Sequence, residues 1–182
     1  VLIHLGYLAY NKAEKRCYIP NMEVVGELKN AIEKNGWKNV MDTLNASDRL
    51  LSDLLDGDAE AVAKGIETAH ERNASILEYN DENSLACVIG MAFYSARNKY
   101  MIVRELPTGK GFADIVFIPW RNINLPAIVV ELKWKQDAHT AIKQIRERNY
   151  PATMSEYSGE VILCGVNYDT KSKVHTCVIE RL

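Results

Sequence analysis

Two apolar segments near the middle of the chain, residues 112–119 (FADIVFIP) and 127–133 (AIVVELK), constrain the fold most strongly. Both are rich in Val and Ile, short, and flanked by Gly or Pro, which is typical of buried strands. Each contains one carboxylate, Asp114 in the first and Glu131 in the second, and Lys133 follows two residues after the glutamate. Because a buried charge is costly unless it is paired, these three residues are candidates for a functional site.

The apolar pattern after residue 80 predicts one mixed α/β unit. The expected elements are a helix over 84–96, strands over 100–106, 112–119 and 127–133, a helix over 137–150, and strands over 160–168 and 174–182. Long apolar strands that are covered by helices imply a central mixed sheet flanked by helices on both faces.

The first part of the chain has a different character. It is predicted to contain the end of a helix at 1–8, a hairpin, a helix capped by Asn21, and short acidic helices over 37–72. A hairpin between helices indicates a small helical segment with winged-helix character, which either binds DNA or packs between domains. We place the boundary near residue 75, so that 1–75 form a linker and 76–182 a second domain.

Charge is distributed unevenly although the net charge is only -2. Residues 47–82 contain ten acidic and three basic residues, whereas residues 133–149 contain five basic and two acidic ones. A polyanion would therefore bind near the second segment, and Lys135 within it is a candidate contact.

The composition also bears on the compartment. Four cysteines lack metal-binding spacing and indicate buried free thiols, which favours a cytoplasmic protein. No apolar run reaches the roughly 18 residues that a membrane span needs. The chain opens on the apolar sequence VLIHLGYLAY without a start methionine, which indicates a piece of a longer protein.

The two carboxylates are expected to meet at one end of the sheet. A short connection makes their strands antiparallel neighbours, and alternation puts Glu131 and Lys133 on the same face. Two close carboxylates repel each other unless one takes up a proton or a cation lies between them. Mg²⁺ or Mn²⁺ would suit such oxygen ligands. The alternative is an ordinary charged strand end, which E-x-K alone would indicate.

The ordered set of motifs resembles the PD-(D/E)xK nuclease superfamily. Asp114 followed by Glu131-Leu132-Lys133 is similar to the superfamily's signature, and QIRERNY (144–150) is similar to the Q-x(n)-Y element of some members. More narrowly, YNDENSL, RELPTGKGFADIVFIP, IVVELKW and QIRERNYP resemble the nuclease-like domain behind AAA-type ATPase domains in bacterial proteins. GYLAYN and YIPNMEV resemble the segment that joins the two.

The resemblance implies a restriction-endonuclease-like core with a metal site. It makes Asp114 and Glu131 metal ligands, the carbonyl of Leu132 a third ligand, and Lys133 the catalytic lysine. Glu82 matches an acidic residue that some members contribute to the metal site, although it would equally favour the positive end of a helix.

The resemblance also implies contacts with the substrate. Gln144 and Tyr150 would position the substrate backbone, or else pack and hydrogen-bond locally. Ala113 stands where the superfamily's name has a proline, and the chemistry does not need that proline.

The sequence therefore predicts a Mg²⁺- or Mn²⁺-dependent nuclease, with DNA as the favoured substrate and RNA as the open alternative. Two alternatives stay open. One is a catalytically inactive nuclease-like fold that binds nucleic acid or protein as a module of a larger ATPase. The other is a structural dimerisation domain for that ATPase. The implied partners are accordingly nucleic acid, an N-terminal ATPase domain and a second copy of the chain.

Overall fold

A computed structural model of the chain describes residues 3–34, 38–73, 81–108, 111–121, 123–147 and 159–182. Contacts divide the chain into two compact units, Val1–Thr43 and Leu44–Leu182. The division falls inside one long helix, α2 (Lys38–Asp56). The boundary that we expect near residue 75 lies outside the described residues and stays a prediction.

The first unit consists of a hairpin and helical segments. Strands β1 (Ala9–Asn11) and β2 (Arg16–Tyr18) pair antiparallel, and the side chain of Asn11 closes the turn by accepting from the backbone N–H of Ala13 at 3.0 Å. This confirms the predicted hairpin, whose winged-helix character stays a prediction.

The helix after the hairpin, α1 (Met22–Lys34), begins where the sequence predicts. The Oδ1 atom of Asn21 accepts from the backbone N–H of Val24 at 2.9 Å, and so caps the helix. The predicted end of a helix at 1–8 is wrong for the described residues of that range. A turn forms there instead, closed by a bond from Gly6 N to Ile3 O at 3.1 Å, and Gly6 has a φ of 80°.

The second unit is built on a five-stranded mixed sheet. Its strands lie in the order β3 (Tyr100–Thr108), β4 (Gly111–Pro119), β5 (Ala127–Trp134), β6 (Val161–Asp169) and β7 (Val174–Arg181). Neighbouring strands are antiparallel except β5 and β6, which are parallel because α5 (Ala138–Glu147) connects them. The predicted mixed α/β class is confirmed.

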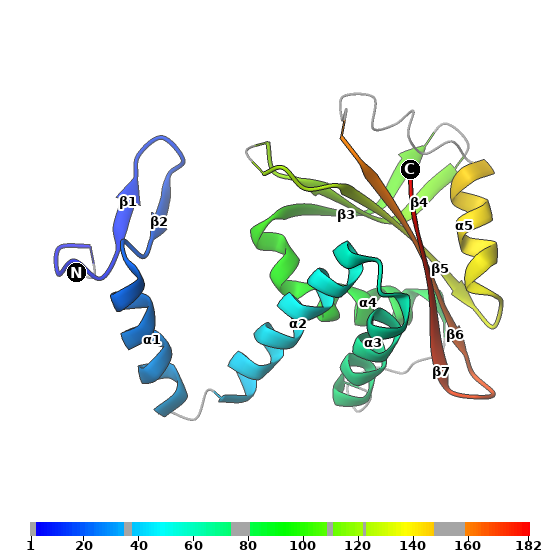
Figure 1. Cartoon of the computed structure of the whole chain (residues 1–182), viewed down its shortest axis with the longest axis horizontal. Helices are drawn as coiled ribbons and strands as arrows, with labels where there is room; N and C mark the ends of the chain where they lie inside the picture. The colour runs from blue at the N-terminus through cyan, green and yellow to red at the C-terminus, as the bar shows by residue number, and fades with distance from the viewer. Residues whose placement is uncertain (1–2, 35–37, 74–80, 109–110, 122, 148–158) are drawn as a thin grey trace. The chain divides into compact units, whose positions relative to one another are not determined.

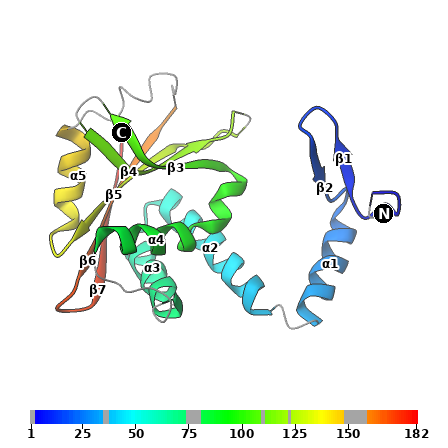
Figure 2. The ribbon, with the colours of Figure 1, turned by 180° about the vertical axis from the view of Figure 1, so that it is seen from behind.

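Helices cover both faces of this sheet (Figures 1 and 2). Helix α5 packs on one face, while α2, α3 (Ala59–Asn73) and α4 (Glu82–Ala92) belong to the other. A short 3-10 helix, η1 (Tyr94–Asn98), connects α4 to β3. Alternation along β5 divides its side chains between the two cores, since Val129 packs with α5 and Val130 packs on the other face.

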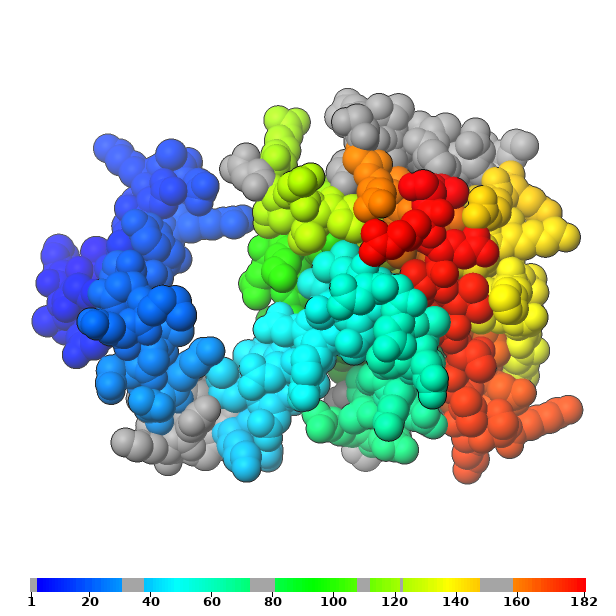
Figure 3. All heavy atoms as spheres, in the orientation of Figure 1, coloured from blue at the N-terminus to red at the C-terminus, as the bar shows by residue number. Residues whose placement is uncertain are grey.

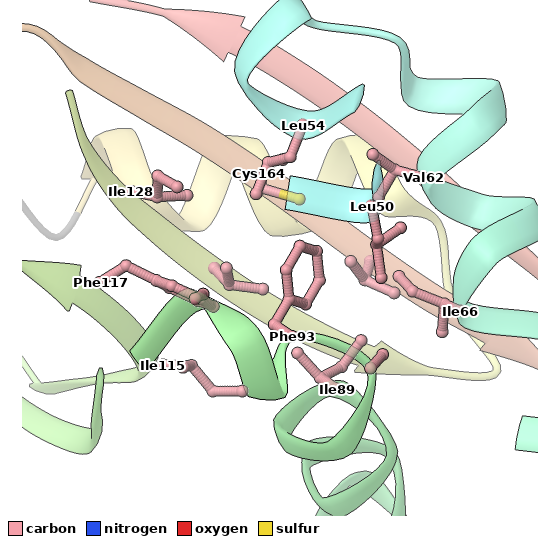
Figure 4. Packing of buried hydrophobic residues seen from close by; sticks show 14 of the residues in the cluster. Leu50, Leu54, Val62, Ile66, Ile89, Phe93, Ile115, Phe117, Ile128 and Cys164 are labelled. Carbon is pink, nitrogen blue, oxygen red and sulfur yellow. The ribbon is translucent and has the colours of Figure 1, made fainter. Parts of the chain in front are cut away.

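The larger core lies between the sheet and α2, α3 and α4 (Figure 4). Its labelled members are Leu50, Leu54, Val62, Ile66, Ile89, Phe93, Ile115, Phe117, Ile128 and Cys164. The rings of Phe93 and Phe117 meet edge to face with their centroids 5.5 Å apart. This core holds β4 and β5, the two strands that carry the candidate site residues.

Helices α2 and α3 differ in length from the sequence expectation of short helices. Helix α2 is 19 residues long and α3 is 15 residues long. Asp58 caps α3, because its Oδ1 atom accepts a hydrogen bond from the backbone N–H of Ala61 at 3.0 Å. Helix α3 then lies beside β7 on the surface of the unit (Figure 3).

The cysteines are free thiols, as expected, but they are not all buried. Cys164 is buried, whereas Cys17 and Cys87 are exposed, so the prediction is wrong for these two. Within the described parts of the chain, no helix has both the length and the apolar character needed to cross a bilayer.

Candidate active site

Asp114 lies where β4 and β5 stop pairing. The ladder between these strands runs from Phe117–Ile128 to Ile115–Val130, and Asp114 with Glu131 would form the next pair. At this level the Oδ2 atom of Asp114 accepts a hydrogen bond from the backbone N–H of Leu132 at 2.7 Å. A side chain thus takes over a backbone donor at the point where the strands part.

The pairing of β4 with its other neighbour, β3, is interrupted at the same level. Strands β3 and β4 pair on either side of Glu105 and Asp114 but not through them, and Glu105 has a φ of 52°. Beyond this point the side chains change faces. Ile115 belongs to the core under α4, whereas Ala113 and Leu106 pack in the core under α5. Asp114 therefore lies at the point where the side chains of the hairpin change faces.

Glu131 and Lys133 form a buried ion pair on the α5 face of the sheet. The Nζ atom of Lys133 lies 3.2 Å from Glu131 Oε1 and donates to the carbonyl oxygen of Leu132 at 3.0 Å. Only 1% of Glu131 and 7% of Lys133 is exposed. Water therefore screens this pair weakly, and each charge depends on the other for compensation.

Gln144 reaches the same carboxylate from α5. Its Nε2 atom donates a hydrogen bond to Glu131 Oε1. Gln144, which the sequence predicts as a substrate contact, is therefore also a partner of the acidic residue. Lys135 is exposed just after β5, and Tyr150 lies outside the described residues.

Glu82 is the first residue of α4 and lines a pocket with Asp114 and Leu132. The helix is capped by its neighbour Asp81, whose Oδ1 atom accepts from Ser84 N at 2.8 Å. The Ser84 hydroxyl donates to the same oxygen at 2.8 Å, and the two hydrogen bonds from Ser84 lower the pKa of Asp81. Because Asp81 caps the helix, Glu82 is left as the acidic residue in its first turn. The pocket has a volume of about 490 Å³.

Asp114 is connected to the strand that carries Glu131 through the backbone of Leu132. Asp114 contacts the N–H of the peptide that joins Glu131 to Leu132. Glu131 and Lys133 are not among the described residues that line the pocket with Glu82. The predicted set is thus arranged around one stretch of β5, with Glu82 on the α4 side and Gln144 on the α5 side.

Two of the predicted ligand oxygens suit a hard divalent ion. Glu131 Oε1 and the carbonyl oxygen of Leu132 both lie within hydrogen-bond distance of one positive atom, Lys133 Nζ, so two predicted ligand oxygens converge. Carboxylate and carbonyl oxygens are the ligands that Mg²⁺ prefers. Among the described residues, no three His, Cys, Asp or Glu side chains are grouped to hold an ion. An ion would therefore need the carbonyl of Leu132 or water in its shell.

Two pocket residues were missed by the sequence analysis. Arg104 Nη2 donates to Asn83 Oδ1 at 2.8 Å, and Arg104 lines the pocket with Trp134 and Asp114. The signal was present, because Arg104 interrupts the apolar strand YMIVREL. Its spacing to Asn83 in the preceding helix follows no sequence rule.

The fold and the site define an α/β protein with a carboxylate–lysine centre where two strands part. Residues 80–177 match the family model of the PD-(D/E)XK nuclease superfamily. The match covers more than half of the chain, and the chain belongs to this superfamily. Its members typically depend on a metal ion and act on nucleic acid. A comparison with curated proteins gives no match.

Proposed function

We propose that this domain is a nuclease that hydrolyses phosphodiester bonds in DNA, with Mg²⁺ or Mn²⁺ as cofactor. The observation that carries the proposal is the arrangement around Leu132. The carboxylate of Asp114 accepts from the N–H of Leu132. The buried ammonium group of Lys133 donates to the carbonyl oxygen of Leu132 and also forms an ion pair with Glu131. Acidic and basic groups are thus held together at one point of the backbone of β5.

In this proposal each residue has a distinct task. Asp114, Glu131 and the carbonyl of Leu132 would hold the ion, with Glu82 as a further acidic ligand from α4. A bound divalent ion would acidify a water molecule and so supply a nucleophile near neutral pH. Lys133 would stabilise the negative charge that develops on the phosphate during hydrolysis.

Three other residues are proposed to assist, one by orienting Glu131 and two by contacting the substrate. Gln144 holds the carboxylate of Glu131 from α5 and would fix its orientation. Lys135, which is exposed after β5, would contact the backbone of the substrate, and so would Tyr150.

Plasmid nicking tests the proposal. The wild-type protein should nick supercoiled DNA with Mg²⁺ or Mn²⁺ and lose this activity in EDTA. Glu131→Ala should lower the rate at least about 100-fold, as expected for loss of a group that acts on the transition state. Glu147→Ala is the matched control, because Glu147 is an exposed glutamate on α5. Equal nicking by wild type and Glu131→Ala would overturn the proposal.

A second candidate is an inactive nuclease-like fold that binds nucleic acid or protein. It is favoured by the ion pair itself, because the ammonium group of Lys133 already compensates Glu131 without a metal ion. Calorimetric titration with Mn²⁺ separates the candidates. Binding that disappears in Asp114→Ala supports the nuclease, and the absence of binding to the wild type supports the second candidate.

We also infer that the domain works in the cytoplasm beside an AAA-type ATPase domain of a longer parent protein. This rests on the resemblance of GYLAYN and YIPNMEV to the joining segment of such proteins. The sequence contains no G-x-x-x-x-G-K-[ST] motif, so ATP binding through a P-loop would come from elsewhere in the parent. A full-length parent that does not hydrolyse ATP would contradict this inference. A dimer in sedimentation would favour a role in dimerisation.

A further inference from the structure

The pocket on the α4 side of the site has an uneven charge. Four of its lining residues are acidic, namely Asp81, Glu82, Glu105 and Asp114, and Arg104 is the basic residue among those described. A phosphate that enters such a pocket is repelled unless a positive group lies beside it. Among the described lining residues, Arg104 has the charge that attracts a phosphate.

The position of Arg104 follows from the sheet. Ile102, two residues earlier on β3, packs in the core under α4, and alternation places Arg104 on the same face. There its Nη2 atom donates to Oδ1 of Asn83, in the first turn of α4, at 2.8 Å. Asn83 is a neutral acceptor, so this hydrogen bond orients the guanidinium group without cancelling its charge. It uses one of the five N–H donors of arginine.

We propose that Arg104 binds a phosphate of the nucleic-acid backbone adjacent to the one that is cleaved, and that Asn83 positions Arg104. The proposal rests on the proposed function, because it takes the cleaved phosphate to lie at Asp114. Arg104 and Asp114 line the same pocket of about 490 Å³, a volume within the range of sites that hold small ligands. A planar guanidinium group matches the geometry of a phosphate.

Binding rather than cleavage is the primary test. Fluorescence anisotropy would follow fluorescein-labelled single-stranded and duplex oligodeoxynucleotides in EDTA and in Ca²⁺, over a series of salt concentrations. Arg104→Ala should weaken binding about tenfold, the expected loss of a hydrogen bond to a charged group. It should also reduce the slope of log K against log salt by about 0.7 to 0.9, the loss of one phosphate contact. Arg104→Lys should keep that slope.

The role of Asn83 is tested in a double-mutant cycle. Asn83→Ala should weaken binding while Arg104 is present, and should have no further effect in the Arg104→Ala background. A merely structural role of Asn83 would weaken binding equally in both backgrounds. Arg121→Ala is the matched control, because Arg121 is exposed beyond the far end of β4 from Asp114 and does not line the pocket.

The outcomes separate this inference from the proposed function. Arg104→Ala with wild-type affinity and salt slope overturns the inference, even if the protein cleaves DNA. A wild-type protein that binds neither oligonucleotide also overturns it. Binding that depends on Arg104, in a protein that never cleaves, refutes the nuclease and leaves the phosphate contact standing. If Arg104→Ala does not fold, a salt slope reduced in Arg104→Lys decides against the inference.

Discussion

The carboxylate of Asp114 accepts a hydrogen bond from the backbone N–H of Leu132 at 2.7 Å, where β4 and β5 stop pairing. This one contact has two consequences. It replaces the backbone partner that Leu132 would otherwise find in the neighbouring strand. It also fixes an acidic side chain beside the peptide that follows Glu131, the second acidic residue of the site.

Substitutions of Asp114 should separate these consequences. Asp114→Asn keeps an oxygen acceptor for the N–H of Leu132, so it should change the free energy of unfolding by only about 1 kcal/mol, the difference between a charged and a neutral acceptor. Asp114→Ala leaves that N–H without this acceptor and should cost about 1–3 kcal/mol. Both variants should lose plasmid nicking, because both lack the carboxylate. Urea unfolding measures the difference, and equal stability of the two variants would contradict the structural role.

The ion pair of Lys133 and Glu131 should be strongly coupled. Lys133→Met removes the ammonium group and leaves Glu131 buried, which should cost about 3–5 kcal/mol of stability. Adding Glu131→Gln should restore part of this loss, because no uncompensated charge remains. Lys143→Met is the control, since Lys143 and its partner Glu147 are exposed, and it should change stability by at most about 0.5 kcal/mol. Additive effects of the two buried substitutions would exclude coupling.

Stability should depend on pH through His175. Burial and the nearby His70 lower the pKa of His175 to about 4. An unfolded histidine has a pKa of about 6.5, so between these values the unfolded chain binds the additional proton. The contribution of His175 to stability should be complete above pH 6.5 and fall by up to about 3 kcal/mol toward pH 4. Urea unfolding of wild type and His175→Phe across this range measures it, and a constant difference would contradict it.

Packing of α5 on the sheet should be sensitive at Gly165. A Cβ atom at this position would lie 2.4 Å from the carbonyl oxygen of Ala138 and 2.9 Å from Ala141 Cβ. Gly165→Ala should therefore push α5 away and destabilise the unit by roughly 1–3 kcal/mol. Because Gly165 pairs with Glu131 across β5 and β6, nicking should fall as well.

Gly90→Ala is the counterpart for that experiment. Gly90 lies within α4, and a Cβ atom there would meet nothing within 4 Å. Alanine in a helix should therefore raise stability by up to about 1 kcal/mol. Thermal unfolding compares the two variants, and destabilisation of similar size in both would refute the contact with Ala138.

The sequence was sufficient to predict the five strands and the helices α4 and α5, because their apolar periods differ clearly. It also predicted that Asp114 and Glu131 lie on adjacent antiparallel strands, since a short connection joins these strands, and β4 and β5 do pair in this way. It did not reveal that Gln144 binds Glu131 or that Arg104 binds Asn83. These contacts depend on where helices lie on the sheet, which local pattern does not determine. The φ of 52° at Glu105 likewise lies where the β3–β4 and β4–β5 pairings are both interrupted, and local sequence pattern does not show this.

The change of faces at Glu105 and Asp114 divides the β3–β4 hairpin into a base and an outer part. In its base the side chains alternate between the two cores, since Ile115 packs under α4 and Val116 under α5, whereas Ala113 and Leu106 of its outer part pack under α5. A longer or shorter tip should leave the base in register, because the base is held by side chains in both cores. Grafting another tip beyond Leu106 and Ala113 would then change the outer end of the hairpin without moving Asp114.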